Sequence, residues 1–386
     1  MKVLLVSTNQ SHPTDAGNRT AIMGQVQILK HLGCDVHFLF VEMSLKQSNI
    51  SQMEAYWGEK FHIYKLNTLC KIHRYFIDII RSNFNHGYWK CDDHYAYGLE
   101  RYVNTLDKQI HFDAIIIQYI RLSKLLPYLS IPRKAIYTHD VFAYKDIRTG
   151  GHFYETCNAH EEAKAVQRCP NIFAIQEEEA TYYKFISPLS QVYTVYNPYI
   201  FHQQPIVNNQ NILFLSSRMD FNVSGFLWFL DNIWGKLLSI IPNAKLIVGG
   251  SICERIPRHK YKNVVLQGHV ESLEDFYAQG NIVINPVSQG TGMKIKTFES
   301  LSFGKSTLVH PHSMEGIYKK DSAPIYFSSD PDEWVQILCE MLDSNYNHLK
   351  NRDADYLYIK NMYIYIENQY KKFLGTSNNL NSDAQY

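Results

Sequence analysis

Short apolar runs alternate with longer segments of helical period along most of this chain. The runs are rich in Val, Ile and Leu, and the segments between them repeat their apolar residues with the period of an amphipathic helix. This alternation is typical of βαβ units, in which helices connect parallel strands. The pattern therefore predicts an α/β protein built on doubly wound parallel sheets.

In the first half, the expected strands are almost continuously apolar, which indicates burial on both faces. They lie at residues 2–6, 36–41, 114–118, 134–138, 171–175 and 192–195. A helix is expected over 18–32, because Ile22, Val26 and Leu29 fall on one face and Gly33 is suited to end it.

The second half repeats this plan and predicts a second complete sheet. Its strands are expected at residues 212–215, 245–248, 264–267, 282–285, 306–309 and 325–327. A helix is expected over 223–241, and helical sequence returns after Asp330. Between the halves, Pro198 and Pro205 interrupt both periods, so a domain boundary is expected within 197–210.

Two sheets predict two Rossmann-like domains. We place the first at 1–200 and the second at 201–350, followed by a helix at 351–375. The last residues, 376–386, are polar and without period, which predicts a disordered tail.

Charge and cysteine content narrow the class of protein. The 38 basic and 37 acidic side chains almost balance, so nothing predicts nucleic acid as a partner. The seven cysteines form no C-x-x-C pair, which favours a reducing cytoplasm and argues against a zinc or dithiol site. No D-x-D pair ends an expected strand, and 353–355 (DAD) is expected on a solvated helix face or at a helix start, so nothing in the sequence argues for a metal or a cofactor.

The stretch 285–294, NPVSQGTGMK, follows an expected strand and opens an expected helix. In doubly wound sheets ligands bind beyond the carboxyl ends of the strands. Gly290 and Gly292 allow close approach of the backbone, and the N–H groups of Met293 and Lys294 would lie at the positive end of the helix dipole. This arrangement predicts a phosphate site.

Two side chains on the same helix extend this prediction. Lys296 adds positive charge at the phosphate end, and Glu299 could accept hydrogen bonds from the hydroxyls of a ribose. The alternative is a turn with a solvated pair of lysines and a Lys296–Glu299 ion pair at i, i+3 spacing, which would contribute little.

The run GTGMKIKTFESLSFGKSTLV, with HSMEGI downstream, resembles the signature of the GT-B glycosyltransferases of family 4, the group 1 glycosyl transferases. Other segments resemble the family in the right order: HPTDAGNRTAIMGQVQILKHLG, YTHDV, AIQEEEATYY, VYTVYNP, FLSSRMDFNVSGFLWFLDNIW, NAKLIVG and VVLQGHV. The resemblance covers most of 1–320, is most specific in the second domain and is weak within 42–113. It implies a GT-B fold, two Rossmann-like domains facing a central cleft, with the last helix crossing back to the first domain.

The resemblance also implies roles for single residues. Gly292, Met293 and Lys294 match the helix N-terminus that cradles the donor diphosphate, and Glu299 matches the ribose-binding glutamate. Arg218 stands where many relatives have a basic residue, but Val223 replaces the usual lysine five positions on.

Thr291 replaces a glutamate that contacts the donor sugar in many members, which leaves the sugar open. In the first domain, His139 and Asp140 match the active-site histidine and its neighbour, and Gly17 matches the glycine of the first loop. The predicted catalytic residues are His139, Asp140, Arg218 and Lys294. The predicted donor-binding residues are Gly17, Asn18, Arg19, Gly290, Thr291, Gly292, Met293, Lys294, Lys296 and Glu299.

The activity that the resemblance implies is a retaining, metal-independent transfer of a hexosyl-type sugar. The donor would be a nucleotide-diphospho-sugar and the acceptor a glycan or a lipid-linked glycan, as in capsule or lipopolysaccharide synthesis. Two alternatives remain open. A nucleotide-sugar 2-epimerase shares the architecture, and a non-catalytic relative would bind the nucleotide sugar without turnover.

One further segment suggests a partner. Residues 71–90 contain four basic and one acidic side chain, with Ile72, Phe76, Ile79, Ile80 and Phe84 spaced as an apolar stripe. Such a helix could lie against the inner face of an anionic membrane or border the acceptor site. The interpretation that we favour is an ordinary packed helix.

Overall fold

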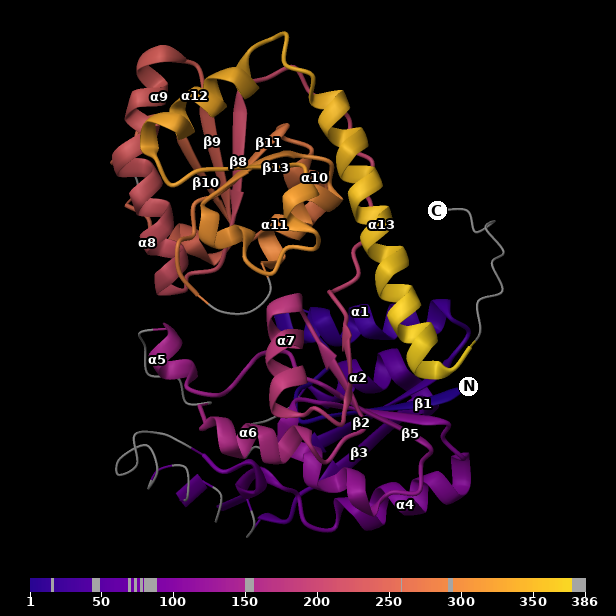
Figure 1. The fold of residues 1–386 in the computed structure, drawn as a ribbon. Coiled ribbons are helices and arrows are strands. Elements are labelled where there is room, and N and C mark those ends of the chain that lie inside the picture. The colour runs from indigo at the N-terminus through magenta and orange to yellow at the C-terminus, as the bar shows by residue number, and fades with distance from the viewer. Residues whose placement is uncertain are drawn as a thin grey trace. The chain divides into compact units, whose positions relative to one another are not determined.

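The computed structural model describes residues 1–14, 17–43, 49–68, 71–72, 75–76, 79, 89–149, 156–257, 259–290 and 294–376. The chain forms two compact units. The first comprises Met1–Pro198 together with Tyr365–Tyr386, and the second comprises Tyr199–Ile364. Each unit is built on one parallel sheet (Figure 1).

The first unit has a seven-stranded sheet in the order β3-β2-β1-β4-β5-β6-β7, with every pair parallel. The strands are β1 (Lys2–Ser7), β2 (Asp35–Glu42), β3 (Phe61–Lys65), β4 (Ala114–Gln118), β5 (Arg133–Tyr137), β6 (Asn171–Ala174) and β7 (Gln191–Thr194). The helices are α1 (Gly17–His31), α2 (Ile50–Trp57), η1 (Gly58–Lys60), η2 (Cys91–His94), α4 (Leu99–Ile110), η3 (Ile120–Tyr128), α5 (Lys145–Thr149), α6 (Ala159–Val166) and α7 (Glu177–Ile186). The strand order reverses between β1 and β4.

Helices cover both faces of this sheet because its strands are apolar on both sides. On one face, Ile117 of β4 packs in a core with Val103 of α4 and Tyr183 of α7. On the other face, Phe38 of β2 stacks on Trp57 of α2, with ring centroids 5.2 Å apart. The loops after the strands therefore meet at one edge of a fully covered sheet, where a ligand site is expected.

The second unit has a six-stranded parallel sheet in the order β10-β9-β8-β11-β12-β13. The strands are β8 (Asn211–Leu215), β9 (Lys245–Gly249), β10 (Val264–Gly268), β11 (Ile282–Asn285), β12 (Ser306–Val309) and β13 (Ile325–Phe327). The helices are α8 (Asp220–Phe229), η4 (Leu230–Trp234), α9 (Gly235–Ile240), η5 (Ser251–Glu254), α10 (Leu273–Tyr277), α11 (Ile295–Ser302), η6 (Pro311–Met314), η7 (Lys320–Ser322), α12 (Pro331–Leu342) and α13 (His348–Leu374). Here the strand order reverses between β8 and β11.

Two groups of helices enclose the second sheet (Figure 1). The first group, α8, η4, α9 and α12, packs on the face that carries Phe214 and Leu246, with Trp334 fully buried among them. On the opposite face, Phe276 and Tyr277 of α10 pack against Phe303, which follows α11. Because α11 begins after β11 at the switch point, the predicted phosphate end of this helix lies at the carboxyl edge of the sheet.

The predicted fold class is confirmed, and the strands agree with the expected ones to within one residue at each end. One strand, β3, was not predicted. Its residues, FHIYK, are only half-buried at the edge of the sheet, so they lack the continuous apolar run that marks the inner strands. Gly33 and Gly304 follow α1 and α11 with φ of +74° and +63°, as expected of glycines that end helices.

Three expectations about the C-terminal part need correction or qualification. The last helix is longer than predicted: α13 begins at His348 and belongs to the second unit up to Ile364. Asp355 does not lie on a solvated face, because it is buried, and neither carboxylate oxygen has a hydrogen-bond partner among the described residues. Burial raises its pKa well above the ordinary value. Of the predicted tail, residues 377–386 lie outside the described residues.

Candidate active site

The first group of candidate residues lies on α11 and in the loop before it. Lys294 precedes the helix, Lys296 lies in its first turn and Glu299 follows about one turn later. All three are half-buried. The predicted contacts of Thr291, Gly292 and Met293 lie outside the described residues.

Glu299 is held by a buried tyrosine. The hydroxyl of Tyr277 donates to Glu299 Oε1 over 2.7 Å, and the Tyr277 ring stacks on Phe303 with centroids 4.4 Å apart. Burial raises the pKa of Glu299, and the hydrogen bond from Tyr277 and the charge of Lys296 counteract this in part. Among the described residues nothing is bonded to Oε2, so this oxygen can accept hydrogen bonds from a ligand.

Lys296 is tied to the neighbouring helix α8. Its Nζ donates to Asn222 Oδ1 over 2.9 Å, and the Asn222 amide in turn donates to Ser217 Oγ over 3.0 Å. The pKa of Lys296 is lowered to about 8, mainly by burial; the charge of Glu299 acts to raise it and that of Lys294 to lower it. Lys296 and Glu299 lie close enough for each charge to shift the pKa of the other, and each also has a further hydrogen-bond partner.

His312, after β12, links both sides of the loop that leads into α11. Its Nε2 lies 2.9 Å from the carbonyl oxygen of Gly290 and 3.1 Å from Lys294 Nζ, and its Nδ1 lies 3.1 Å from a carboxylate oxygen of Glu315. One ring nitrogen cannot donate to a carbonyl and accept from an ammonium at the same time. Gly290 and Lys294 therefore compete for His312. Gly290 has a φ of +114°, a conformation that side chains other than hydrogen rarely allow.

Arg218 lies at the carboxyl end of β8 but does not meet these residues. Its guanidinium bonds Glu254 over 2.8 Å, and both side chains are mostly exposed. The loop is shaped by Gly250, whose φ is +90° and where a Cβ would lie 2.2 Å from the carbonyl oxygen of Ser216. An exposed ion pair contributes little to stability, so Arg218 can exchange Glu254 for a ligand at little cost.

The second group of candidates lies in the first unit, at the carboxyl ends of β4 and β5. The ring of His139 stacks on that of Tyr119 at 4.2 Å, and its Nε2 lies 2.7 Å from Gln118 Oε1. Asn18, at the start of α1, hydrogen-bonds the hydroxyl of Tyr119. Burial lowers the pKa of His139 to about 3, so the imidazole is neutral at physiological pH.

His139 and Tyr119 each have a strained backbone conformation. Their φ angles are +62° and +67°, in the left-handed region that side chains other than glycine seldom occupy. Strain of this kind persists only where the surrounding structure enforces it, and it concentrates at functional sites. The strain therefore makes the ends of β4 and β5 a candidate functional region on grounds that do not depend on a sequence motif.

The loop after His139 is fixed by buried charges. Asp140 Oδ2 lies 2.6 Å from Lys145 Nζ. The fully buried carboxylate of Glu162 accepts from the backbone N–H groups of Phe142 and Ala143, each over 2.9 Å. Of the other predicted residues in this unit, Gly17 begins α1, and Arg19 donates to the carbonyl of Pro13 over 3.1 Å.

Comparison with known proteins identifies the second unit. Residues 209–344 match the family described as "Glycosyl transferases group 1". The second unit is a group 1 glycosyl transferase domain. The region matched contains β8 to α12, and so the whole of α11 with its two lysines and Glu299. The predicted family is confirmed.

A relative and two solved structures extend the likeness beyond the glycosyl transferase domain. The "Uncharacterized 44.6 kDa protein in cps region" of Klebsiella pneumoniae is 21% identical over 335 residues, which are 78% of this chain and 80% of that protein. The structure of Anabaena HepE in complex with UDP has a TM-score of 0.66 at 13% identity and covers 98% of this chain and 100% of its own. The pneumococcal O-GlcNAc transferase GtfA in complex with UDP and GlcNAc has a TM-score of 0.64 at 12% identity, covering 97% and 98%. At these identities the structures show the fold alone, which is GT-B.

Several polar residues around the glycosyl transferase domain's α11 were not predicted. Tyr277, Asn222 and His312 contact the candidate side chains, yet each lies at least 18 positions from its partner in sequence. The motif HSMEGI contains His312, so that residue could have been singled out from its place beside the signature. No sequence signal marks Asn222 or Tyr277 as partners of a lysine or a glutamate.

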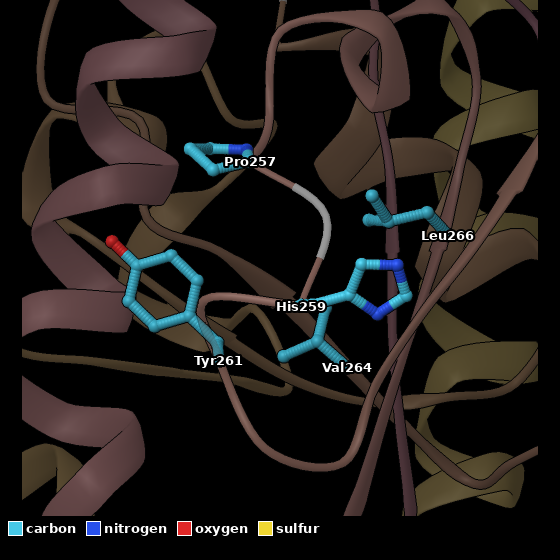
Figure 2. Close-up of a pocket in the computed structure, with 5 residues that line it drawn as sticks. All are labelled: Pro257, His259, Tyr261, Val264 and Leu266. Carbon is cyan, nitrogen blue, oxygen red and sulfur yellow. The ribbon is translucent and has the colours of Figure 1, made fainter.

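A separate pocket in the glycosyl transferase domain lies away from this chemistry. Figure 2 shows its five lining side chains around a cavity of about 250 Å³. They come from edge strand β10 and the loop before it: Pro257, His259, Tyr261, Val264 and Leu266. This loop precedes the strand, so the pocket lies toward the amino end of β10, whereas α11 begins beyond the carboxyl ends.

Two features are absent from the described residues: a helix that could span a membrane and a cluster of side chains that could bind a metal ion. No helix in these parts of the chain combines the length and the apolar character needed to cross a bilayer. Nor do the described ranges bring together three or more His, Cys, Asp or Glu side chains that could share a metal ion.

Proposed function

We propose that this protein is a retaining, metal-independent glycosyltransferase that moves a hexosyl-type sugar from a nucleoside-diphosphate sugar to a glycan or lipid-linked acceptor. The observation that supports this most is the placement of Lys294, Lys296 and Glu299 along α11, within the matched family region. The two lysines supply positive charge for a diphosphate. The free carboxylate oxygen of Glu299 supplies an acceptor for ribose hydroxyls.

In the proposed reaction, the bond between the anomeric carbon and the diphosphate oxygen breaks, and its electron pair stays on the diphosphate. The acceptor hydroxyl oxygen bonds to that carbon on the same face, and its proton passes to the departing phosphate oxygen. Stabilising the negative charge that develops on the diphosphate is the main task of the protein. Lys294, Lys296 and the N-terminus of α11 perform it in this proposal, and Arg218 joins them by leaving Glu254.

Relatives support the choice of ligand and of setting. HepE and GtfA were solved in complex with UDP, so we propose a uridine diphosphate sugar as the first donor to test. The Klebsiella relative is named for a cps region, which supports a role in capsule synthesis. We propose that the protein acts at the cytoplasmic side of the membrane. The acceptor would then be a growing surface polysaccharide.

A thermal-shift screen tests the proposal. The panel contains UDP, GDP, ADP and CDP with their common sugar conjugates, each with and without the full-length protein. A ligand at about 100 times its Kd stabilises the protein by about 2.7 kcal/mol, so one nucleotide should raise the Tm clearly above the rest. If no nucleoside diphosphate shifts the Tm, the proposal is wrong. Conversion of free nucleotide sugars without an acceptor would instead indicate an epimerase. Binding of a nucleotide sugar without any turnover would indicate a non-catalytic relative.

Lys296 predicts how this binding depends on pH. Its pKa of about 8 means that the ammonium is present below that pH and lost above it. A diphosphate binds the charged form, so the affinity for UDP should fall by about tenfold between about pH 7 and about pH 9. Isothermal titration calorimetry measures this dependence.

A matched pair of variants checks the assignment. Lys296→Met should weaken UDP binding at pH 7 and remove the fall at higher pH. Lys305→Met is the control, because Lys305 is also buried with a pKa lowered to about 8 but lies at the start of β12, and it should keep the fall. An unchanged pH profile in Lys296→Met would contradict the role of Lys296.

We further propose that the segment 71–90 contacts an anionic membrane. Its described apolar residues have the spacing of one helix face, yet they are exposed rather than packed into the core. They are Ile72, Tyr75, Phe76 and Ile79, at 39, 57, 58 and 38% exposure. The expected packed helix is therefore wrong for these side chains, while Ile80 and Phe84 lie outside the described residues. Exposed apolar side chains in a segment of net positive charge suit an anionic bilayer surface.

Vesicle flotation tests this contact. The protein should float with vesicles that contain phosphatidylglycerol and not with vesicles of phosphatidylcholine alone. Phe76→Ser should reduce flotation, whereas Phe185→Ser, at an 86% exposed position on α7, should not. Equal loss in both variants, or none in either, would refute a specific contact through this segment.

A further inference from the structure

A chain of buried hydrogen bonds leads from His139 to the C-terminal helix within the first unit. His139 Nε2 lies 2.7 Å from Gln118 Oε1, and Gln118 Nε2 donates to Gln25 Oε1 over 2.6 Å. Gln25 Nε2 then donates to the hydroxyl of Tyr370 over 3.0 Å. The four side chains come from the loop after β5, from β4, from α1 and from α13. The chain therefore connects four elements that are distant in sequence.

The three supporting side chains are almost completely buried, at 1% exposure each. A buried amide that loses its hydrogen bonds destabilises the fold, whereas Leu or Met at the same positions would bring no such penalty. Two glutamines in the core are thus unfavourable unless both ends of each amide are bonded. In this structure the amide oxygen of Gln118 faces His139 and that of Gln25 faces Gln118, which gives the chain one direction. With both amides turned over the chain would run the other way and the imidazole proton would lie on Nδ1, so the position of that proton decides between the two.

That direction fixes the protonation of His139. A glutamine carbonyl oxygen only accepts, so the proton of the neutral imidazole must reside on Nε2. The lone pair is then on Nδ1, the nitrogen that the chain leaves available. The other end is equally constrained, because the Tyr370 ring packs on Phe173 with centroids 5.0 Å apart.

We propose that Gln118, Gln25 and Tyr370 are positioning residues that hold His139 as the Nε2–H tautomer with Nδ1 turned toward the reaction. The final helix of the chain is then part of the reactive centre of the first unit rather than a packing element alone. The strained φ of His139 and its stack on Tyr119 leave the ring few orientations. The hydrogen bond from Nε2 then selects one of the two orientations that differ by a half-turn about the Cβ–Cγ bond. The proposal rests on the proposed function in so far as His139 acts on the donor sugar.

Nitrogen-15 NMR of the full-length protein with labelled histidine tests the tautomer without any substrate. His139 is assigned by comparison with His139→Asn. We expect a neutral imidazole with the proton on Nε2 and no protonation down to about pH 4, in keeping with its lowered pKa. A proton on Nδ1 would overturn the proposal.

Variants test the supporting groups. Tyr370→Phe should speed exchange of the Nε2 proton and lower turnover of the donor by about tenfold, the lower end of the range for groups that orient metal-ligating histidines. Tyr193→Phe is the matched control, because this tyrosine also packs on Phe173 but lies outside the chain of bonds, and it should change neither. Equal effects of the two substitutions would reduce Tyr370 to a packing residue and refute its role.

Gln118→Glu should change the pKa of His139, which a purely structural role of Gln118 would leave unchanged. A carboxylate bonded to Nε2 favours the imidazolium, so the pKa of His139 should rise by one unit or more, about tenfold in proton affinity. In a background of His139→Ala, substitutions of Gln118 should have no further effect on turnover, whereas additive losses would contradict the proposal. If the NMR results hold but no nucleotide sugar is turned over, the positioning stands and the proposed function fails instead.

Discussion

Glu299→Ala is expected to weaken the binding of UDP by about 100-fold. Two hydrogen bonds from ribose hydroxyls to an ionised carboxylate contribute about 1.5 kcal/mol each or more, and their loss totals about 3 kcal/mol. The fold should survive, because Glu299 is half-buried and only one donor among the described residues, the buried hydroxyl of Tyr277, loses its acceptor, which costs about 1–3 kcal/mol. Isothermal titration calorimetry with UDP and with inorganic pyrophosphate, which lacks the uridine, separates the contribution of the ribose to the affinity from that of the diphosphate.

The comparison with pyrophosphate gives this prediction its specificity. Glu299→Ala should leave pyrophosphate binding within a factor of about two, because the carboxylate does not face the phosphates in our proposal. Glu340→Ala, at an exposed position on α12, is the control and should bind both ligands as the unmodified protein does. If Glu299→Ala binds UDP with undiminished affinity, the ribose of UDP does not bind at Glu299 and the prediction is wrong.

Glu162→Ala is expected to lower the free energy of unfolding of the first unit by about 3 kcal/mol or more. The carboxylate has no exposed surface and accepts four hydrogen bonds. The donors are the backbone N–H groups of Phe142 and Ala143 and the hydroxyls of Tyr182 and Tyr183. Removing the carboxylate leaves the buried N–H groups of Phe142 and Ala143 without an acceptor, and it removes one partner each from the half-buried hydroxyl of Tyr182 and from that of Tyr183, which keeps the carbonyl of Asp140. Each buried donor left unpaired costs free energy that packing does not recover.

Hydrogen exchange read by mass spectrometry measures this effect locally, because peptides of the two units are distinguished. Peptides around 139–149 should lose protection first, since Glu162 fixes the loop after His139. Glu178→Ala, an exposed position on α7, should change the free energy by no more than about 0.5 kcal/mol. Unchanged protection in Glu162→Ala would mean that the four hydrogen bonds contribute nothing net.

Most strands and the helix with the candidate residues could be predicted from the sequence, because adjacent residues determine where each of these elements begins and ends. The strands β11 and β12 have the predicted bounds, since each is a short apolar run bounded by polar or turn-forming residues. The place of Lys294, Lys296 and Glu299 on one helix followed from the glycines before it. In contrast β3 was missed, because an edge strand needs no continuous apolar sequence.

The partners of the site residues could not be predicted in the same way. Lys296 and Asn222 are 74 positions apart, and His139 reaches Tyr370 only through two glutamines on other elements. Gln118 reads as the polar end of a strand, and Gln25 interrupts the buried face of α1 without any motif. Arg218 was expected at a diphosphate, but without a ligand its nearest opposite charge is Glu254. Such contacts depend on how distant segments fold together.

One measurement tests the central claim most directly: a crystal structure of the full-length protein soaked with UDP. The account predicts the diphosphate against the N-terminus of α11 with Lys294 and Lys296, and the ribose hydroxyls on the carboxylate of Glu299. Nucleotide bound elsewhere, for example in the pocket beside β10, with Glu299 still bonded only to Tyr277, would contradict it.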